Sequence, residues 1–280
     1  MTAAEPKSPI NILVSNDDGI FAEGIQTLVS WLARQYNVTV FAPDRERSAM
    51  GHALTLHKPL RLTEVAMDAP VVKAYAVAGT PSDCVKIALS AILDSPPDLV
   101  ISGINHGPNL GTDVLYSGTV SAAIEGAIHD IPSIAVSLHN GNDKYADFNP
   151  TAEFIASIVP RVLATKLPPK TILNVNTPGL SLGDMAGIRL TTLGHRMYKD
   201  TYECRQDPRG GVYYWLVGEI VTQDSEPTSD VRAISENHIT ISPIHFDMTD
   251  ERLATSSALA AQYNYTGALH NWMSSISPRH

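Results

Sequence analysis

Short apolar runs rich in Val and Ile alternate with longer stretches of helical spacing over residues 10–175. The apolar runs are continuous, which is typical of strands covered by helices on both faces of a sheet. Each run leads into a helical stretch, so we predict an α/β fold: a three-layer sandwich with a mainly parallel sheet. The predicted strands span residues 10–14, 38–42, 71–77, 99–102, 134–138 and 172–175, and the predicted helices span residues 23–35, 82–93, 119–129 and 151–164.

The pattern changes after residue 183, where shorter alternating or aromatic runs begin. Gly and Asp-Pro over residues 207–211 predict a long hairpin with Arg205 and Arg209 at its tip. We therefore expect a core over residues 1–183 and a C-terminal antiparallel arm over residues 184–280, or one integrated domain. The extended runs are residues 188–193, 212–217, 231–235 and 238–241, and a terminal helix is predicted over residues 253–273.

The hairpin carries the aromatic cluster Tyr213-Tyr214-Trp215. Aromatic surface on a projecting arm is usually buried against another molecule, often a second copy of the chain. The sequence therefore predicts a homodimer or homotetramer.

Composition excludes several classes of protein. The chain has 280 residues and a formal net charge of −9, whereas binding to a nucleic-acid polymer depends on clustered Lys and Arg. No apolar stretch approaches the roughly 18 residues of a membrane span, and residues 1–9 lack the apolar centre of a signal peptide. We expect a cytoplasmic protein that needs no membrane, with Cys84 and Cys204 reduced and non-catalytic.

Polar residues follow three of the predicted strands. Asn16-Asp17-Asp18-Gly19 comes directly after the first strand, and Ser48 lies in the loop after the second. Asn105 and Asn109 follow the strand that ends near residue 102. Because ligands bind outside the carboxyl ends of parallel strands in open α/β sheets, we expect these side chains to lie close together.

The adjacent acids at 17 and 18 repel each other, so if structure encloses both, either one is protonated or a cation lies between them. Carboxylate, hydroxyl and amide oxygens are the donors that Mg²⁺, Mn²⁺ and Ca²⁺ prefer. We predict one divalent cation per subunit, Mg²⁺ or Mn²⁺, with Ca²⁺ as an alternative.

A second feature is the turn Ser117-Gly118-Thr119, which comes directly before a helical stretch rich in small residues. Backbone N–H groups at a helix start, with hydroxyls beside them, bind phosphate oxygens. A metal site next to a phosphate site indicates phosphoryl chemistry.

Each of these residues also has a plain structural interpretation. Asp17 and Asp18 could cap a helix, and Ser48 could be a turn hydroxyl. Asn105 and Asn109 could be turn residues beside glycines, and Ser117 and Thr119 could be ordinary N-caps.

Five sequence blocks resemble the SurE (stationary-phase survival protein) family of nucleotidases in order and spacing. The resemblance extends through Ser242-Pro243-Ile244-His245 and covers nearly the whole chain, although residues 198–230 are not clearly matched. The blocks are Ser15-Asn16-Asp17-Asp18-Gly19-Ile20, residues 42–51 (APDRERSAMG), Gly79-Thr80-Pro81-Ser82-Asp83-Cys84-Val85, residues 102–113 (SGINHGPNLGTD) and residues 116–126 (YSGTVSAAIEG).

The resemblance implies a Rossmann-like core, a C-terminal arm exchanged between subunits, and a metal-dependent phosphatase that acts on nucleoside monophosphates. It places the metal ligands on Asp17, Asp18, Ser48 and Asn105.

Our mechanistic hypothesis is that Asp17, Asp18 and Asn105 are catalytic through the cation, with a metal-bound water attacking in line. An alternative mechanism, in which Asp17 attacks the phosphorus as a covalent nucleophile, stays open. The phosphate would be bound by Asn109, Ser117, Gly118 and Thr119.

A non-catalytic nucleotide sensor with a Rossmann-like fold is the alternative function. The turn after the first strand lacks a GxGxxG signature, and the chain has no Walker-type Gly-Lys-Ser/Thr and no G-x-S-x-G elbow. These absences disfavour dinucleotide binding, P-loop chemistry and acyl hydrolysis. The sequence leaves open the preferred nucleotide and any action on 3′-nucleotides or short polyphosphate.

Overall fold

The computed structural model describes residues 9–139, 146–196, 198–220 and 226–257. Contacts group Met1–His245 into one compact unit and Phe246–His280 into a second. Within the second unit, α6 (Glu251–Ala254) is a short helix. Most of the terminal helix predicted over residues 253–273 lies outside the described residues.

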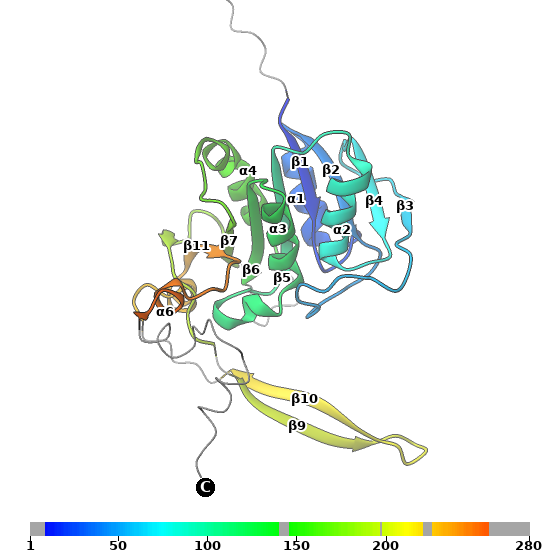
Figure 1. Ribbon diagram of the computed structural model, residues 1–280, viewed down its shortest axis with the longest axis vertical. Helices are drawn as coiled ribbons and strands as arrows, with labels where there is room; N and C mark the ends of the chain where they lie inside the picture. The colour runs from blue at the N-terminus through cyan, green and yellow to red at the C-terminus, as the bar shows by residue number, and fades with distance from the viewer. Residues whose placement is uncertain (1–8, 140–145, 197, 221–225, 258–280) are drawn as a thin grey trace, which may run out of the picture. The chain divides into compact units, whose positions relative to one another are not determined.

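A nine-stranded mixed sheet forms the centre of the first unit (Figure 1). Neighbouring strands from β4 to β7 run parallel, whereas β3 pairs antiparallel with β4, and β11 pairs antiparallel with β7 and parallel with β8. The predicted α/β class with a mainly parallel sheet is confirmed. In spatial order the strands are β3 (Leu62–Glu64), β4 (Lys73–Val77), β2 (Asn37–Pro43), β1 (Asn11–Ser15), β5 (Leu99–His106), β6 (Ser133–His139), β7 (Thr171–Pro178), β11 (His238–His245) and β8 (Gly187–Leu190).

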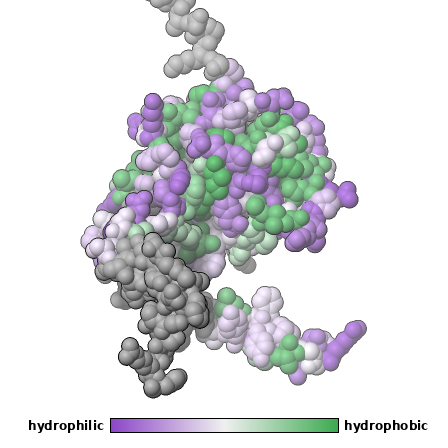
Figure 2. Space-filling view, in the orientation of Figure 1, coloured by the Kyte–Doolittle hydropathy of each residue, from purple (hydrophilic) through white to green (hydrophobic). Residues whose placement is uncertain are grey.

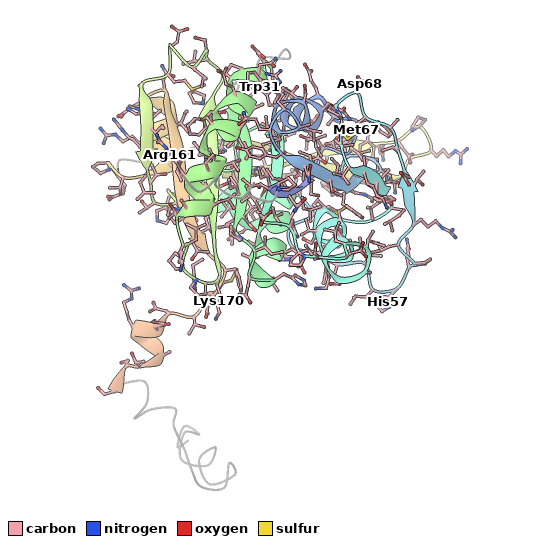
Figure 3. The ribbon with its side chains drawn as sticks, turned by 90° about the horizontal axis from the view of Figure 1, so that it is seen from above. Trp31, His57, Met67, Asp68, Arg161 and Lys170 are labelled. Carbon is pink, nitrogen blue, oxygen red and sulfur yellow. The ribbon has the colours of Figure 1, made fainter. Side chains whose placement is uncertain are left out.

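Helices cover both faces of this sheet (Figures 1 and 3). Successive residues of a strand point to opposite faces. Accordingly Ile12 and Val14 pack with apolar residues of α1 (Glu23–Leu32) and α4 (Asn149–Ala164). Leu13 lies in a separate cluster with residues of α2 (Pro81–Ile87) and α3 (Gly118–Ile128). Burial on both faces explains the continuous apolar runs of the sequence.

The segment beyond residue 183 contributes two strands to the main sheet and forms a separate hairpin. Strands β8 and β11 extend the main sheet, so contacts do not separate the chain at residue 183. The predicted hairpin is present as β9 (Tyr198–Gln206) and β10 (Val212–Ile220), a separate antiparallel pair. In Figure 2 hydrophobic residues, in green, appear on the surface of this hairpin.

Residues 231–235, read as an extended run, form helix α5 (Asp230–Ser235), so that prediction was wrong. Ser229 caps the helix, since its hydroxyl accepts a hydrogen bond from the Arg232 amide. Ala233 and Ile234 are buried on one side. The run was too short to distinguish helix from strand by its spacing, and the cap decided the outcome.

No helix in the described part of the chain is both long and apolar enough to cross a membrane.

Candidate active site

The two acids after β1 contact three other segments of the carboxyl edge. Asp17 is 4% exposed, and its Oδ1 accepts a hydrogen bond from the Thr119 hydroxyl. Its backbone oxygen accepts one from the Arg47 amide at 2.7 Å. Asp18 Oδ2 accepts one from the His106 amide at 3.0 Å. The acids therefore join the loop after β2, the end of β5 and the start of α3.

Neither acid caps the following helix. The N-cap of α1 is Ala22, which makes no side-chain capping bond. Instead the chain turns tightly, because Asn16 Oδ1 accepts from the Gly19 amide at 3.2 Å and Asn16 Nδ2 donates to the Gly19 carbonyl at 2.9 Å. Gly19 has φ +100°, and a Cβ there would lie 3.1 Å from the Arg45 carbonyl carbon. A glycine is thus required for this turn.

Both carboxyl groups are difficult to ionise in this setting. Burial raises the pKa of Asp17 to about 6, opposed by the Thr119 hydrogen bond and reinforced by the charge of Asp18. Burial also raises the pKa of Asp18, and the charge of Glu46 adds to this effect. A bound cation would offset both costs, so the acid pair fits a divalent metal ion.

Ser48 and Asn105 are each the chain neighbour of a residue whose backbone amide bonds to the acids, Arg47 and His106 respectively. Ser48 is exposed and directly follows Arg47, and its hydroxyl donates to Glu46 Oε1 at 2.7 Å. Asn105 lies at the end of β5, which runs past the predicted end at residue 102 through an irregular register with β6. Asn105 Nδ2 donates to the Gly107 carbonyl at 2.7 Å, so the amide oxygen is the end available to a cation.

In the ranges that the structure describes, no group of three or more His, Cys, Asp or Glu side chains is placed to hold a metal. A cation bound by Asp17, Asp18, Ser48 and Asn105 would have carboxylates together with neutral oxygens as its protein ligands. Such a donor set suits Mg²⁺ or Mn²⁺ and not zinc.

The start of α3 lies directly against Asp17. Ser117 is the N-cap, and its Oγ accepts from the Val120 amide at 3.1 Å. A Cβ at Gly118 would lie 2.8 Å from Asp17 Cβ and 3.0 Å from Asp17 Oδ2. Only glycine permits this approach. The Ser117-Gly118-Thr119 turn thus places the first N–H groups of the helix beside Asp17, and the Thr119 N–H group bonds to the Asp17 carboxylate itself.

Asn109 has a different setting from the other predicted site residues. It is 7% exposed, and its Nδ2 donates to Ser137 Oγ at 2.8 Å. The backbone N–H group of Asn109 donates to Asn176 Oδ1 at 2.8 Å. The side-chain Nδ2 atoms of Asn174 and Asn176 both donate to the backbone carbonyl of Asn109. This network fixes the loop after β5, and phosphate binding by Asn109 stays a prediction.

Sequence reasoning gave no role to Glu125, which the structure buries at 2% exposure on α3. Its carboxylate lies 2.9 Å from His52 Nε2 and 2.8 Å from Lys86 Nζ. The sequence signal that could have identified Glu125 is a single acid inside a helix of small and apolar residues. When such an acid is buried, it needs partners of opposite charge or hydrogen-bond donors.

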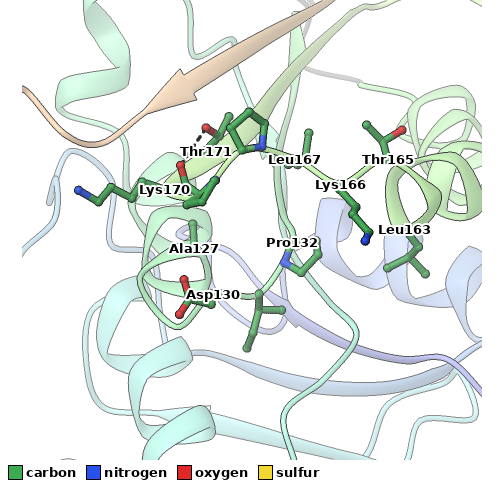
Figure 4. Close-up of a pocket in the computed structure, with 12 residues that line it drawn as sticks. Ala127, Asp130, Pro132, Leu163, Thr165, Lys166, Leu167, Lys170 and Thr171 are labelled. Carbon is green, nitrogen blue, oxygen red and sulfur yellow. Dashed lines mark hydrogen bonds between the residues drawn. The ribbon is translucent and has the colours of Figure 1, made fainter.

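A cavity of about 330 Å³ lies away from the acid pair (Figure 4). It is lined by Asp130, Pro132 and Thr171 among others, next to the first residues of β6 and β7. Strands β6 and β7 run parallel to β5 and β1, so the first residues of all four strands lie at the same edge of the sheet. The cavity therefore lies at this amino edge, whereas the acid pair lies at the carboxyl edge. The position expected for ligands in such sheets is the carboxyl edge.

The chain is similar to known proteins over most of its length. The family model described as "Survival protein SurE" matches residues 12–200. A protein named "5'-nucleotidase SurE" from Gloeothece citriformis (strain PCC 7424) is 51% identical over 256 residues, covering 87% of this chain and 93% of the relative. A protein of the same name from Moorella thermoacetica (strain ATCC 39073 / JCM 9320) is 52% identical over 239 residues, covering 85% of this chain and 91% of the relative.

The solved structure "Crystal Structure of Sure Protein from Aquifex aeolicus" superposes with a TM-score of 0.77 at 39% identity, covering 90% of this chain and 99% of that one. The matched region includes the acid pair, the Ser48 loop, the end of β5 and the start of α3. The chain belongs to the SurE family.

Proposed function

We propose that this chain is a metal-dependent 5′-nucleotidase, which hydrolyses nucleoside monophosphates to nucleoside and phosphate. The observation that carries the proposal is the contact of the α3 start with Asp17, where a Cβ at Gly118 would lie 3.0 Å from a carboxylate oxygen. A cation at the acids and a phosphate at the helix start would then be neighbours. Relatives at about half identity carry the name 5'-nucleotidase SurE.

Asp17, Asp18, Ser48 and Asn105 would hold one divalent cation, Mg²⁺ or Mn²⁺, with Ca²⁺ as the alternative. When bound, such a cation polarises a phosphoryl oxygen and lowers the pKa of an attacking water. The raised pKa values of the two acids support this assignment, because the cation would stabilise their ionised forms.

The chain's own groups would position and stabilise the substrate. The N–H group of Gly118 would donate to a phosphoryl oxygen, with the Ser117 hydroxyl beside it, and the partial positive charge of the helix start favours the anion. Thr119 would take part through Asp17, because its backbone N–H group and its hydroxyl both bond to that carboxylate. These bonds would fix the acid relative to the phosphate. Asp17 as a covalent nucleophile is the alternative to attack by water.

Replacement of Asp17 by Asn tests the function. Phosphate released from AMP and GMP should require Mn²⁺ or Mg²⁺ and stop with a chelator. Asp17→Asn should lower turnover at saturating metal by at least about 100-fold, more than the loss usually seen for residues that only support a ligand. A variant that keeps most of its turnover would contradict the assignment of Asp17.

The same assay separates the enzyme from a nucleotide sensor. A sensor would bind AMP without releasing phosphate under any metal. Adding 3′-AMP and short polyphosphate to the panel tests the wider substrate range, which we include in the proposal because a backbone turn recognises the phosphate and not the sugar.

Assembly into a homodimer or homotetramer through the hairpin is also part of the proposal. Tyr202 on β9 and Tyr214 and Leu216 on β10 are each more than half exposed. An isolated two-stranded hairpin is at best marginally stable in water. Burial of these side chains against a second copy would stabilise it.

A further inference from the structure

The loop that carries Ser48 is held on both sides of this residue. On one side, the Arg47 amide donates to the Asp17 carbonyl at 2.7 Å. On the other side, residues 51–55 contact α2, α3 and the residue before Ser117. Residues 48–50 between these anchors are exposed. The position of the Ser48 hydroxyl therefore depends on how firmly the two sides are fixed.

The first downstream anchor is the start of α2. Thr80 and Asp83 form a capping box, in which the Thr80 hydroxyl accepts from the Asp83 amide and Asp83 Oδ2 accepts from the Thr80 amide. The Thr80 hydroxyl also donates to the Ala53 carbonyl at 2.7 Å, and the Thr55 amide donates to Asp83 Oδ1 at 3.0 Å. Both capping side chains thus hold the loop as well as the helix.

The second anchor is Glu125 on α3. Its Oε2 lies 2.9 Å from Nε2 of His52, a loop residue, and its Oε1 lies 2.8 Å from Lys86 Nζ on α2 and 3.6 Å from His129 Nε2. Burial alone would raise the pKa of Glu125, but the hydrogen bonds and charges of His52 and Lys86 lower it below its ordinary value. The carboxylate is therefore ionised at neutral pH, and Lys86 Nζ on α2 is its partner besides His52.

Glu125 also links the loop to the proposed phosphate turn, since α3 begins at Gly118, beside Asp17. The Gly51 amide donates to the Tyr116 carbonyl at 3.0 Å, which adds a backbone contact at the same helix start. Helix α3 is therefore in contact with both Asp17 and the loop that carries Ser48.

We propose that Thr80, Asp83 and Glu125, with His52 as the loop contact of Glu125, are positioning residues that place Ser48 beside Asp17 for binding of a divalent cation. We call Thr80, Asp83 and Glu125 the loop clamp. This inference rests on the proposed metal site. The loop clamp acts through Ser48 and touches no reacting atom.

His52→Ala tests the clamp with little risk to folding, because Glu125 keeps its contacts with Lys86 and His129. We would titrate the full-length protein with Mn²⁺ alone by calorimetry. Mn²⁺ affinity should fall by about tenfold, as when a residue that supports a metal ligand is removed. His52→Gln, whose amide can donate to Glu125, should regain most of the loss. Glu153→Gln, an exposed acid on α4, should leave Mn²⁺ affinity unchanged.

A double-mutant cycle separates positioning from a general structural role. Ser48→Ala should weaken Mn²⁺ binding, and adding His52→Ala to it should cause no further loss. An equal loss from His52→Ala in both backgrounds would overturn the clamp, as would no loss in the wild-type background.

Asp17→Asn, titrated in parallel, reports on the metal site itself. Loss of Mn²⁺ binding in Asp17→Asn together with unchanged binding in His52→Ala overturns the clamp alone. Mn²⁺ binding that survives in Asp17→Asn overturns the metal site and the clamp with it.

Discussion

At the scale of single residues, Asp17 should make metal binding depend on pH. Burial raises its pKa from 3.8 to about 6, so the unfolded chain loses this proton first as pH rises. Without metal, the contribution of Asp17 to folding free energy therefore becomes less favourable between those two values. Below about pH 6 protons compete with the cation. The thermal stabilisation by Mn²⁺ should grow between pH 5 and pH 7, and scanning calorimetry with Asp17→Asn as control checks this.

Gly118 is the second residue whose identity the site requires. An added methyl group would meet Asp17 Oδ2 at 3.0 Å and Pro81 Cγ at 3.0 Å. Gly118→Ala must therefore separate α3 from Asp17. We expect AMP turnover to fall by about 100-fold, the cost of a displacement near 1 Å. Gly183→Ala is the control, since its nearest atom would be Ser181 Oγ at 4.0 Å; an equal effect of both changes would contradict this reasoning.

At the scale of secondary-structure elements, Asp230 ties α5 to the loop before α3. It is fully buried; its Oδ2 accepts from the Gly111 amide at 2.9 Å and its Oδ1 from the Gly194 amide at 2.8 Å. Asp230→Asn replaces one acceptor with a donor that faces an N–H group. The free energy of unfolding should fall by about 2 to 3 kcal/mol in urea titrations. Asp94→Asn, at an exposed acid, should change it little.

At the scale of the whole molecule, the hairpin has two unlike faces. The strand period and register place Tyr202, Tyr214 and Leu216 on one face, and Glu203 with Trp215 on the other. We expect the first face to pack against a second copy, because Tyr202, Tyr214 and Leu216 are exposed there together, whereas the other face also carries the charged side chains of Glu203 and Arg205.

Leu216→Glu places a charge on that face and should weaken self-association by about 2 kcal/mol or more, as at a central interface residue. Sedimentation velocity over a range of concentrations measures the change, with Glu203→Gln on the opposite face as control. A wild-type chain that sediments as a monomer at every concentration would contradict the assembly itself.

The sequence by itself determined the layered α/β class, because continuous apolar strands and helical spacing reflect burial on both faces, a local property of the pattern. It also placed Asp17 and Asp18 at a strand end, where the polar turn residues follow directly. The hairpin tip at residues 207–211 was predictable for the same reason, since turn residues act on their own backbone.

Only the tertiary structure decided where β8 and β11 belong, because strand pairing joins segments far apart in the chain and leaves no local signal. The same holds for α5, which formed through its cap and burial although its short run suited a strand equally well. The contacts of Thr119 with Asp17 and of Glu125 with His52 link different strand ends and helices. Composition and spacing identify which residues can bind a cation, whereas packing decides which of them are brought together and what holds them there.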